Sequence, residues 1–336
     1  MESVVRSLVS FFSRSGSSGG HEVGDTAPAP GSPEAGMAES SPAVDLSLEV
    51  ARLHTWLIDR RNRDSSGEPA AQESILSELR RRIRDHNLSR IPRQPRVLPR
   101  LIQALRDEFQ THTDVARIIQ DEPALTDELL RVVNATLEKP GQRPVESVQQ
   151  AVLLIGFDGV RRAVSEAVMR PVMQGASRAE ANFARNAWRW GLTCATACDY
   201  LEQQEKGRNS DLFMIGLTPA FAYLTIYREL ETIALDQTGN RRLGRSTLDA
   251  ALDELVGEVL VCLTHAWQLP AHFVRQLDEL DPVPLGSAES LLSKGMIVGT
   301  HKVLRQAGFR TLTWKELMEL TRIPPKRVER LQAQLE

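Results

Sequence analysis

The sequence predicts an all-α protein, and three observations support this fold class. From about residue 44 onward, apolar residues recur at spacings of three and four, the period of a helix with one buried face. The alternating apolar and polar pattern of a half-buried strand is absent from the sequence. The periodic segments are separated by turns rich in glycine and proline, and no internal repeat relates them. We therefore expect a set of packed helices.

Two N-terminal segments differ from the rest of the chain. Residues 1–14 carry a short apolar stripe flanked by Arg6 and Arg14, as a helix lying on a membrane surface or on a partner would. Because so short a helix is marginal in water, we favour a frayed or weakly docked end over membrane contact. Residues 15–43 are dominated by Gly, Ser, Pro and Ala without an apolar period, which predicts a disordered linker.

Residues 44–90 are expected to form a two-helix N-terminal extension. The first helix covers about 44–60, where apolar residues lie three and four apart, and the segment DSSGEPA ends it. The second helix covers about 70–86. Its last turns hold several arginines, which suit the negative end of the helix dipole.

Five helical segments are expected between Ile91 and Val172. They cover residues 98–109, 114–120, 124–137, 145–155 and 158–172. Prolines punctuate the entry to the first, Thr113 is placed to cap the second, and Pro140-Gly141 ends the third. Gly156 is expected to end the fourth and to let the next helix pack closely.

Seven further helices are expected after this part. They cover residues 179–204, 211–233, 246–267, 270–280, 288–306, 314–321 and 324–335. The second of them is strongly apolar throughout, which favours a place at the centre of the fold, and Pro219 is expected to interrupt it. Ser246 suits the N-cap of the third. We expect residues 309–336 to pack as a helix pair on the preceding domain.

Composition and charge exclude several classes of protein. The formal net charge is −3, from 41 basic and 44 acidic residues, which indicates neither a nucleic-acid coat protein nor an acidic tail. No run approaches the roughly 18–20 apolar residues of a transmembrane helix, and the N-terminus does not fit a signal peptide. Cys194, Cys198 and Cys262 are too few for a disulfide framework. We interpret them as small core residues of a cytoplasmic protein, in preference to a metal or redox pair.

Three sequence words between residues 91 and 172 occur in a distinctive order. They are IPRQPRVLPRLIQAL, ARIIQDEPALTDELLRVVNA and VESVQQAVLLIGFDGVRRAV. In this order they resemble the N-terminal half of HDOD domains, which are helical domains similar to the HD phosphohydrolases. The resemblance continues more faintly to about Gly308, so the expected HDOD-like domain covers residues 91–308.

The residues that carry this resemblance have structural roles on physical grounds. They are Pro123, Leu130, Arg131, Asn134, Gln150 and Gly156. A proline suits the first turn of a helix, and Leu130 is expected on the buried side of its helix. Asn134 is a polar residue among apolar ones, so we expect its amide to bond to the backbone of a neighbouring loop. A functional role for Asn134 is the less favoured interpretation.

The resemblance also shows where a metal site is missing. HD phosphohydrolases hold divalent metal with histidines and an adjacent His-Asp pair, because a metal-activated water attacks the phosphate ester. Similarity of the later segments to the family's helices puts Trp190 at the first histidine and Thr218-Pro219 at the His-Asp pair. The late histidine pair falls within LDELD, which has no histidine. We therefore expect no metal and no cofactor, but a vestigial pocket at Trp190, Thr218 and Pro219 that could take a ligand or a partner.

No other catalytic pattern replaces this site. His265 and His272 lie seven apart with Pro270 between them, which favours solvated or helix-capping side chains over displaced metal ligands. Asp249 and Asp253 lie four apart on a helix, as many solvated carboxylates do. No HExxH, CxxC, GxSxG or glycine-rich phosphate loop occurs.

Nucleic-acid binding is not expected. Residues 78–106 are locally basic, but no aromatic residues are interleaved with the arginines as stacking platforms. A solvated helix end or an intramolecular acidic partner is the favoured interpretation. The C-terminal segment WKELMELTRIPPKRVERLQAQL lacks the polar recognition face of a helix-turn-helix motif.

These observations favour a regulatory protein that is not an enzyme. The HDOD resemblance implies a bacterial signal-transduction protein that acts through protein–protein contact, with a partner that the sequence does not identify. Two alternatives remain open. One is a diverged metal-dependent phosphohydrolase with displaced ligands, and the other is a sensor that binds a nucleotide at the vestigial pocket without turnover.

Overall fold

The computed structural model describes residues 46–58, 69–94, 96, 99–100, 103, 112–137, 144–173, 175, 177–205, 211–241 and 243–335. They form helices α2 (Ser47–Leu57), α3 (Pro69–Arg84), α5 (His112–Gln120), α6 (Pro123–Leu137), α7 (Val148–Met169), α8 (Arg178–Glu205), α9 (Leu212–Thr238), α10 (Arg245–Ala266), α11 (Ala271–Leu277), α12 (Leu291–Gln306), α13 (Trp314–Thr321) and α14 (Pro325–Gln334), with short 3-10 helices η1 (Arg170–Met173) and η2 (Asp278–Leu280). No strand occurs among these residues, so the predicted all-α class is confirmed. The segments 1–14 and 15–43, and most of the stripe at 98–109, lie outside the described residues.

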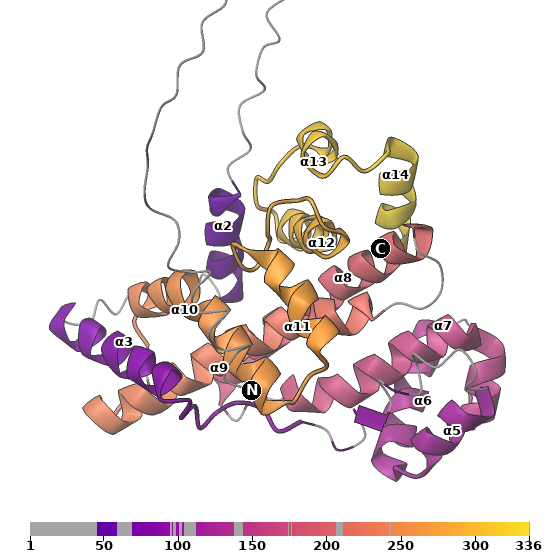
Figure 1. The fold of residues 1–336 in the computed structure, drawn as a ribbon, viewed down its shortest axis with the longest axis horizontal. Coiled ribbons are helices and arrows are strands. Elements are labelled where there is room, and N and C mark those ends of the chain that lie inside the picture. The colour runs from indigo at the N-terminus through magenta and orange to yellow at the C-terminus, as the bar shows by residue number, and fades with distance from the viewer. Residues whose placement is uncertain are drawn as a thin grey trace, which may run out of the picture. The chain divides into compact units, whose positions relative to one another are not determined.

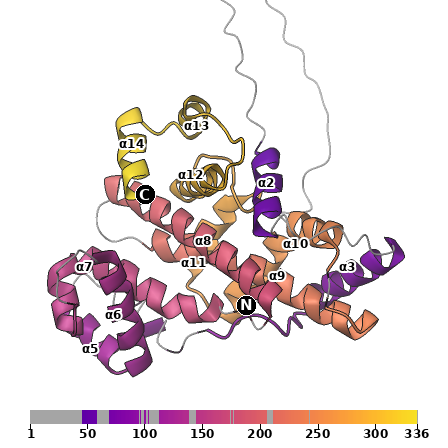
Figure 2. The same cartoon turned by 180° about the vertical axis from the view of Figure 1, so that it is seen from behind.

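Helices α8 and α9 form the centre of the packed helices. Nearly every residue of α9 is buried, as its strongly apolar sequence predicts. Helix α8 packs along α9, α10 packs on α9, and α12 packs on α8. Figure 1 shows this arrangement, and Figure 2 shows the same helices from behind. The largest fully buried side chains include Trp190, Phe213 and Tyr223 from the two central helices.

Small residues let α8 approach both of its neighbours. A Cβ atom added to Gly191 on α8 would lie 2.7 Å from the Cβ of Ala220 on α9. A Cβ atom added to Gly299 on α12 would lie 2.5 Å from the Cα of Cys194 on α8. Real Cβ atoms essentially never come within 3.0 Å of another residue's heavy atoms, so both helix crossings favour glycine.

Helices α5, α6 and α7 pack on one another and form a group beside the central helices (Figure 1). They contact the central helices mainly through α7 and the η1 turn that follows it. Arg162 on α7 forms an ion pair with the buried Asp199 on α8, and its guanidinium also donates to Gln203 at 3.3 Å. These contacts fix the position of the three-helix group relative to α8.

Two predicted helix breaks are wrong. Helix α7 runs without interruption through Gly156, which was expected to end a helix. A glycine inside a helix costs only about 1 kcal/mol relative to alanine, so packing on α5 and α6 outweighs it. Helix α9 likewise continues through Pro219. The proline removes one backbone hydrogen bond, and the burial of α9 on all sides compensates for that loss.

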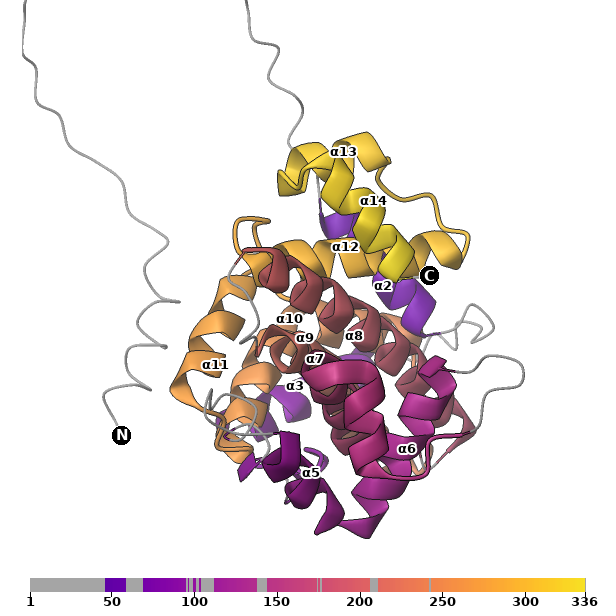
Figure 3. The same cartoon turned by 90° about the vertical axis from the view of Figure 1, so that its right-hand side faces the viewer.

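The helices outside the central group pack on it at different places. Helix α2 contacts α8, α10 and α12, whereas α3 contacts α9 and α10. Helices α13 and α14 lie beyond α12, as Figure 3 shows from the side. The Trp314 ring on α13 packs edge-on against the His301 ring on α12, with 4.5 Å between centroids. None of the described helices is long and apolar enough to cross a membrane.

Candidate functional site

Trp190 lies on the buried face of α8, at the centre of the helix packing. Its side chain is 0% exposed. The indole Nε1 donates a 2.8 Å hydrogen bond to the hydroxyl of Thr300 on α12, and the ring packs 5.0 Å from the ring of Tyr223 on α9. The residue that stands where the family resemblance expects a histidine is therefore a hydrogen-bonded core residue that joins three helices.

Thr218 and Pro219 lie on the part of α9 that crosses α8. The close approach of Gly191 to Ala220 brings this part of α9 against the turn of α8 that contains Trp190. The Thr218 hydroxyl is buried and donates to the carbonyl of Met214, one turn earlier in its own helix, at 3.1 Å. Proline has no side-chain donor or acceptor. The structure thus brings the α8 segment with Trp190 and the α9 segment with Thr218 and Pro219 together. The side-chain polar atoms of Trp190 and Thr218 are hydrogen-bonded to other groups of the fold.

A polar chain that the sequence analysis missed lies next to these residues. His54 on α2 is buried, and its Nε2 lies 3.1 Å from the hydroxyl of Tyr223. Its Nδ1 lies 3.2 Å from a carboxylate oxygen of Asp253 on α10. A neutral imidazole satisfies both contacts by accepting from the tyrosine and donating to the aspartate. The available signal was a histidine inside the apolar face of the helix predicted at 44–60.

The pH dependence of stability should report this buried histidine. Burial lowers the pKa of His54 to about 4, from an ordinary value of 6.5. The unfolded chain therefore binds a proton that the folded chain resists, so the stabilisation is complete above pH 6.5 and is lost as the pH falls toward 4. The difference corresponds to at most about 3 kcal/mol.

The measurement is urea denaturation at several pH values between 4 and 7.5. The variant His54→Gln keeps a hydrogen-bonding side chain but does not titrate, so its free energy of unfolding should fall less over this window than that of the wild type. Burial also lowers the pKa of His301 to about 4. The free energy of unfolding of the His54→Gln variant should therefore still depend on pH in part. Equal slopes for both proteins would contradict the prediction.

The two histidines considered as displaced ligands do not assemble a metal site. His272 on α11 lies 3.0 Å from the carboxylate of Asp211, the residue that precedes α9. His265 on α10 is exposed, and its ring centroid lies 6.4 Å from that of His86. No group of three or more His, Cys, Asp and Glu side chains that could hold a metal ion occurs in the described part of the chain.

The cysteines on α8 are buried packing residues. Cys194 and Cys198 are 0% exposed and free of disulfides. Their thiols lie near the carbonyl oxygens of Met296 and Leu292 on α12, at 3.6 and 3.5 Å. Burial raises the pKa of both thiols well above the ordinary range, which disfavours the thiolate that a metal or redox reaction needs.

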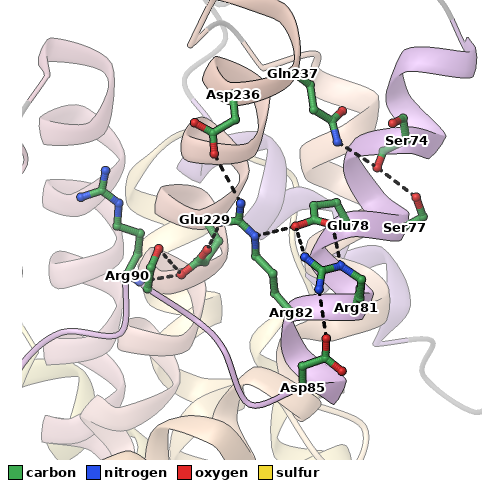
Figure 4. A network of polar contacts seen from close by, with 11 residues as sticks. Ser74, Ser77, Glu78, Arg81, Arg82, Asp85, Arg90, Glu229, Asp236 and Gln237 are labelled. Carbon is green, nitrogen blue, oxygen red and sulfur yellow. Dashed lines mark hydrogen bonds and ion pairs between the residues drawn. The ribbon is translucent and has the colours of Figure 1, made fainter.

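The basic residues near the end of α3 pair with acidic side chains of the same chain (Figure 4). Arg80 binds Glu73 and Glu254, and Arg81 binds Glu78 and Asp85. Arg82 reaches the buried Glu229 of α9 at 3.0 Å and Asp236 at 3.4 Å. These contacts favour the intramolecular interpretation of this basic stretch, because the pairing of these three arginines leaves less positive charge for a phosphate backbone.

The residues that carry the family resemblance lie in the three-helix group, on or beside α6 and α7. Pro123 is the first residue of α6, and Leu130 is partly buried against the core. Arg131 is exposed and pairs with Glu128 at 2.5 Å. The side chain of Gln150 accepts from the backbone N–H of Glu146 at 3.1 Å, just before α7 begins. Each of these contacts is structural.

Asn134 makes the backbone contacts that its sequence setting predicts. Its Nδ2 donates to the carbonyl of Val145 at 3.0 Å, and the N–H of Val145 donates to its Oδ1 at 2.7 Å. The side chain therefore holds the segment before α7 against α6. We expect Asn134→Ala to lower the free energy of unfolding by about 1–3 kcal/mol, because a largely buried backbone pair loses both partners.

Chemical denaturation measures this loss, and Arg131→Ala on the exposed side of the same helix is the control. If Asn134→Ala left the stability unchanged, the structural role would be refuted.

Comparison with known proteins places the chain among helical domains of one family. The model of the HDOD domain matches residues 91–280, more than half of the chain. A candidate metal-dependent phosphohydrolase from Shewanella amazonensis SB2B is similar in structure, with 17% identity and a TM-score of 0.55 over 80% of this chain and 100% of that one. An HDOD domain protein with unknown function from Geobacter sulfurreducens matches with 16% identity and a TM-score of 0.53, over 80% and 94%. At these identities the likeness shows the fold alone. No curated protein matches the sequence.

Proposed function

Because the chain belongs to the HDOD domain family, we propose that it is a regulatory protein of bacterial signal transduction that acts by binding another protein. We propose further that it works in the cytoplasm and does not hydrolyse phosphate esters. In this proposal the helical domain is a binding scaffold, and the region that would hold metal in an HD phosphohydrolase has become part of the packed core.

The observation that carries the proposal is the chemistry of the region around Trp190. Metal-assisted hydrolysis needs imidazole and carboxylate ligands that converge on one point open to water. The indole of Trp190 is buried and bonded to Thr300, and the Thr218 hydroxyl is bonded to its own helix. Pro219 offers no ligand atom. These residues suit a core and do not suit a metal ion.

Metal analysis of the purified full-length chain, together with a phosphomonoester and phosphodiester hydrolysis assay, tests this proposal against the phosphohydrolase alternative. We expect less than stoichiometric iron, manganese and zinc, and no hydrolysis above that of a buffer blank with each metal added. Stoichiometric metal that is lost with activity in His265→Ala or His272→Ala would overturn the proposal and establish displaced ligands.

A thermal-shift screen tests the nucleotide-sensor alternative. A nucleotide that binds only the folded chain raises its melting temperature, by an amount that grows with ligand concentration above the dissociation constant. We expect no shift with mononucleotides or cyclic dinucleotides at millimolar concentration. A saturable shift would make the chain a nucleotide sensor in place of a purely protein-binding module.

A further inference from the structure

Helix α2 occupies an unusual position in this fold. It lies outside the region that matches the HDOD domain, yet it packs against three helices of the main body, α8, α10 and α12. Its inner face buries Leu53 and Leu57, which lie one turn apart, and also His54 and Glu49. Helix α2 therefore packs on the core helices through one face that carries both apolar and polar side chains.

The surface beneath α2 has the chemistry of a helix-binding site. Tyr223 presents its hydroxyl to His54 at the base of this surface, and its ring is tilted by 58° against the Trp190 ring, with 5.0 Å between centroids. Aromatic residues of this kind dominate the energy of protein interfaces. Asp253 lies at the edge of the surface, and its carboxylate contacts His54 while most of its side chain stays exposed.

Asp253 lies on α10 near two other carboxylates, Asp249 and Glu254, which pair with Arg245 and Arg80. The pKa of Asp253 is raised by partial burial and by the neighbouring negative charges of Asp249 and Glu254 on the same helix. Its carboxylate would be stabilised by a full positive charge. His54 supplies none when neutral, and burial keeps it neutral by lowering its pKa to about 4. A basic side chain at this place in a helix would complement the aspartate better than His54 does.

The packing of α2 on this surface also leaves one polar atom without a partner in the described part of the chain, near the N-terminal end of the helix. Glu49 is buried, its Oε2 has no hydrogen-bond partner among the described residues, and burial raises the pKa of its carboxyl. The other oxygen, Oε1, pairs with Arg52 of the same helix. Burial of the unbonded oxygen opposes docking. With only 11 residues, α2 is also marginally stable as a helix away from this surface. The contact of α2 with the rest of its own chain is thus weaker than the contact of a helix with an apolar residue at the Glu49 position.

We propose that the α8–α10–α12 surface under α2 is a docking site for an amphipathic helix of a partner protein, and that α2 occupies it until that helix displaces it. The partner helix would carry two apolar residues one turn apart, as Leu53 and Leu57 are, and a basic residue beside the first that reaches Asp253. This rests on the proposed function, because it names the surface through which a protein-binding regulator would act. Recognition of a helix in a groove by such anchors is a common mode of protein binding.

A labelled peptide measures the exchange directly. The probe is a fluorescein-labelled peptide of residues 44–60, and fluorescence anisotropy reports its binding to the full-length chain. In the wild type, α2 competes with the peptide for the same surface, and because α2 is tethered its effective concentration is on the order of millimolar. The variant Leu53→Asp should expel α2, since it places a charge at a fully buried position. We expect the peptide to bind Leu53→Asp at least tenfold more tightly than the wild type.

A matched control lies on the same helix. Leu48 is 52% exposed, so Leu48→Asp should leave α2 in place and bind the peptide as weakly as the wild type does. On the Leu53→Asp chain, a peptide with Glu49→Leu should bind several-fold more tightly than the native peptide. Adding Asp253→Lys to that chain should weaken a peptide carrying His54→Arg at least tenfold. Equal binding by wild type and Leu53→Asp, or no binding to a folded Leu53→Asp chain, would overturn the proposal.

Hydrogen exchange of the wild type keeps the proposal testable if Leu53→Asp does not fold. The amides of α2 should exchange through a local opening, with protection factors at least tenfold lower than those of α8 and α9. Exchange of α2 only together with the central helices would count against displacement. Failure of these tests leaves the proposed function intact, whereas metal-dependent hydrolysis would remove that function whatever the peptide does.

Discussion

Replacing Gly299 by alanine is expected to lower the free energy of unfolding by about 3 kcal/mol. The new Cβ would lie 2.5 Å from the Cα of Cys194 and 2.8 Å from its backbone nitrogen. Those atoms belong to the backbone of α8, so they cannot rotate away, and the two helices would have to separate. The gain of about 1 kcal/mol that alanine brings to a helix is smaller than this cost.

Gly257 on α10 is the matched control for Gly299. A Cβ added there meets only one side-chain carbon of Val283, at 3.7 Å, which is an ordinary contact. We therefore expect Gly257→Ala to raise the free energy of unfolding by about 0.5–1 kcal/mol, through helix propensity alone. Guanidinium denaturation followed by circular dichroism measures both variants. Effects of the same sign would show that α8 and α12 are less closely packed than described.

The second large effect is expected from Arg82→Ala, at about 3 kcal/mol. Arg82 donates to Glu229, a carboxylate that is 0% exposed and sits on the central helix α9 (Figure 4). Glu229 also accepts from the N–H of Arg90 at 2.5 Å and from the hydroxyl of Ser89 at 3.3 Å. Removal of the guanidinium leaves a buried negative charge with only neutral donors, which is more costly than the loss of an exposed ion pair.

Arg81 provides the comparison on the same helix. Its pairs with Glu78 and Asp85 lie on the exposed side of α3, so Arg81→Ala should change the stability little. Adding Glu229→Gln to Arg82→Ala should recover part of the loss, because the buried charge is then absent. Denaturation of the single and double variants forms a cycle that tests this. A double variant less stable than Arg82→Ala alone would contradict the argument.

These two expectations concern the framework on which the proposed function depends. Gly299 sets the distance between α8 and α12, which form two sides of the surface that α2 covers. Arg82 and Glu229 tie α3 to α9, so the second helix of the N-terminal extension is anchored by a buried ion pair. Helix α2 is held differently among the described residues: Glu49 pairs with Arg52 of the same helix, and α2 meets its neighbours through the His54–Asp253 contact and through hydrogen bonds from Asn186 and Arg245. This difference supports exchange of α2 and retention of α3.

The fold class and most helix positions followed from the sequence because they depend on local features. The three-four period of apolar residues predicted the helix over 314–321, and the structure gives α13 the same bounds. The side chain of Thr313 caps that helix in a capping box with Glu316, three residues later. The contact of Asn134 with the loop at Val145 spans only 11 residues and was also predictable. Signals of this kind lie within about three helix turns of sequence.

The tertiary structure decided which helices contact one another and which of the predicted helix breaks occur. Gly156 and Pro219 carry local signals to stop, but packing on neighbouring helices outweighs their cost of about 1–3 kcal/mol. The contact of His54 with Tyr223 joins residues 169 positions apart in sequence, and its contact with Asp253 joins residues still further apart. No periodic pattern encodes such contacts. Sequence resemblance could place Trp190 where a ligand is expected, and only the packed helices show that its indole is bonded to Thr300. Local preference fixes helices, whereas burial and pairing between distant residues fix the site.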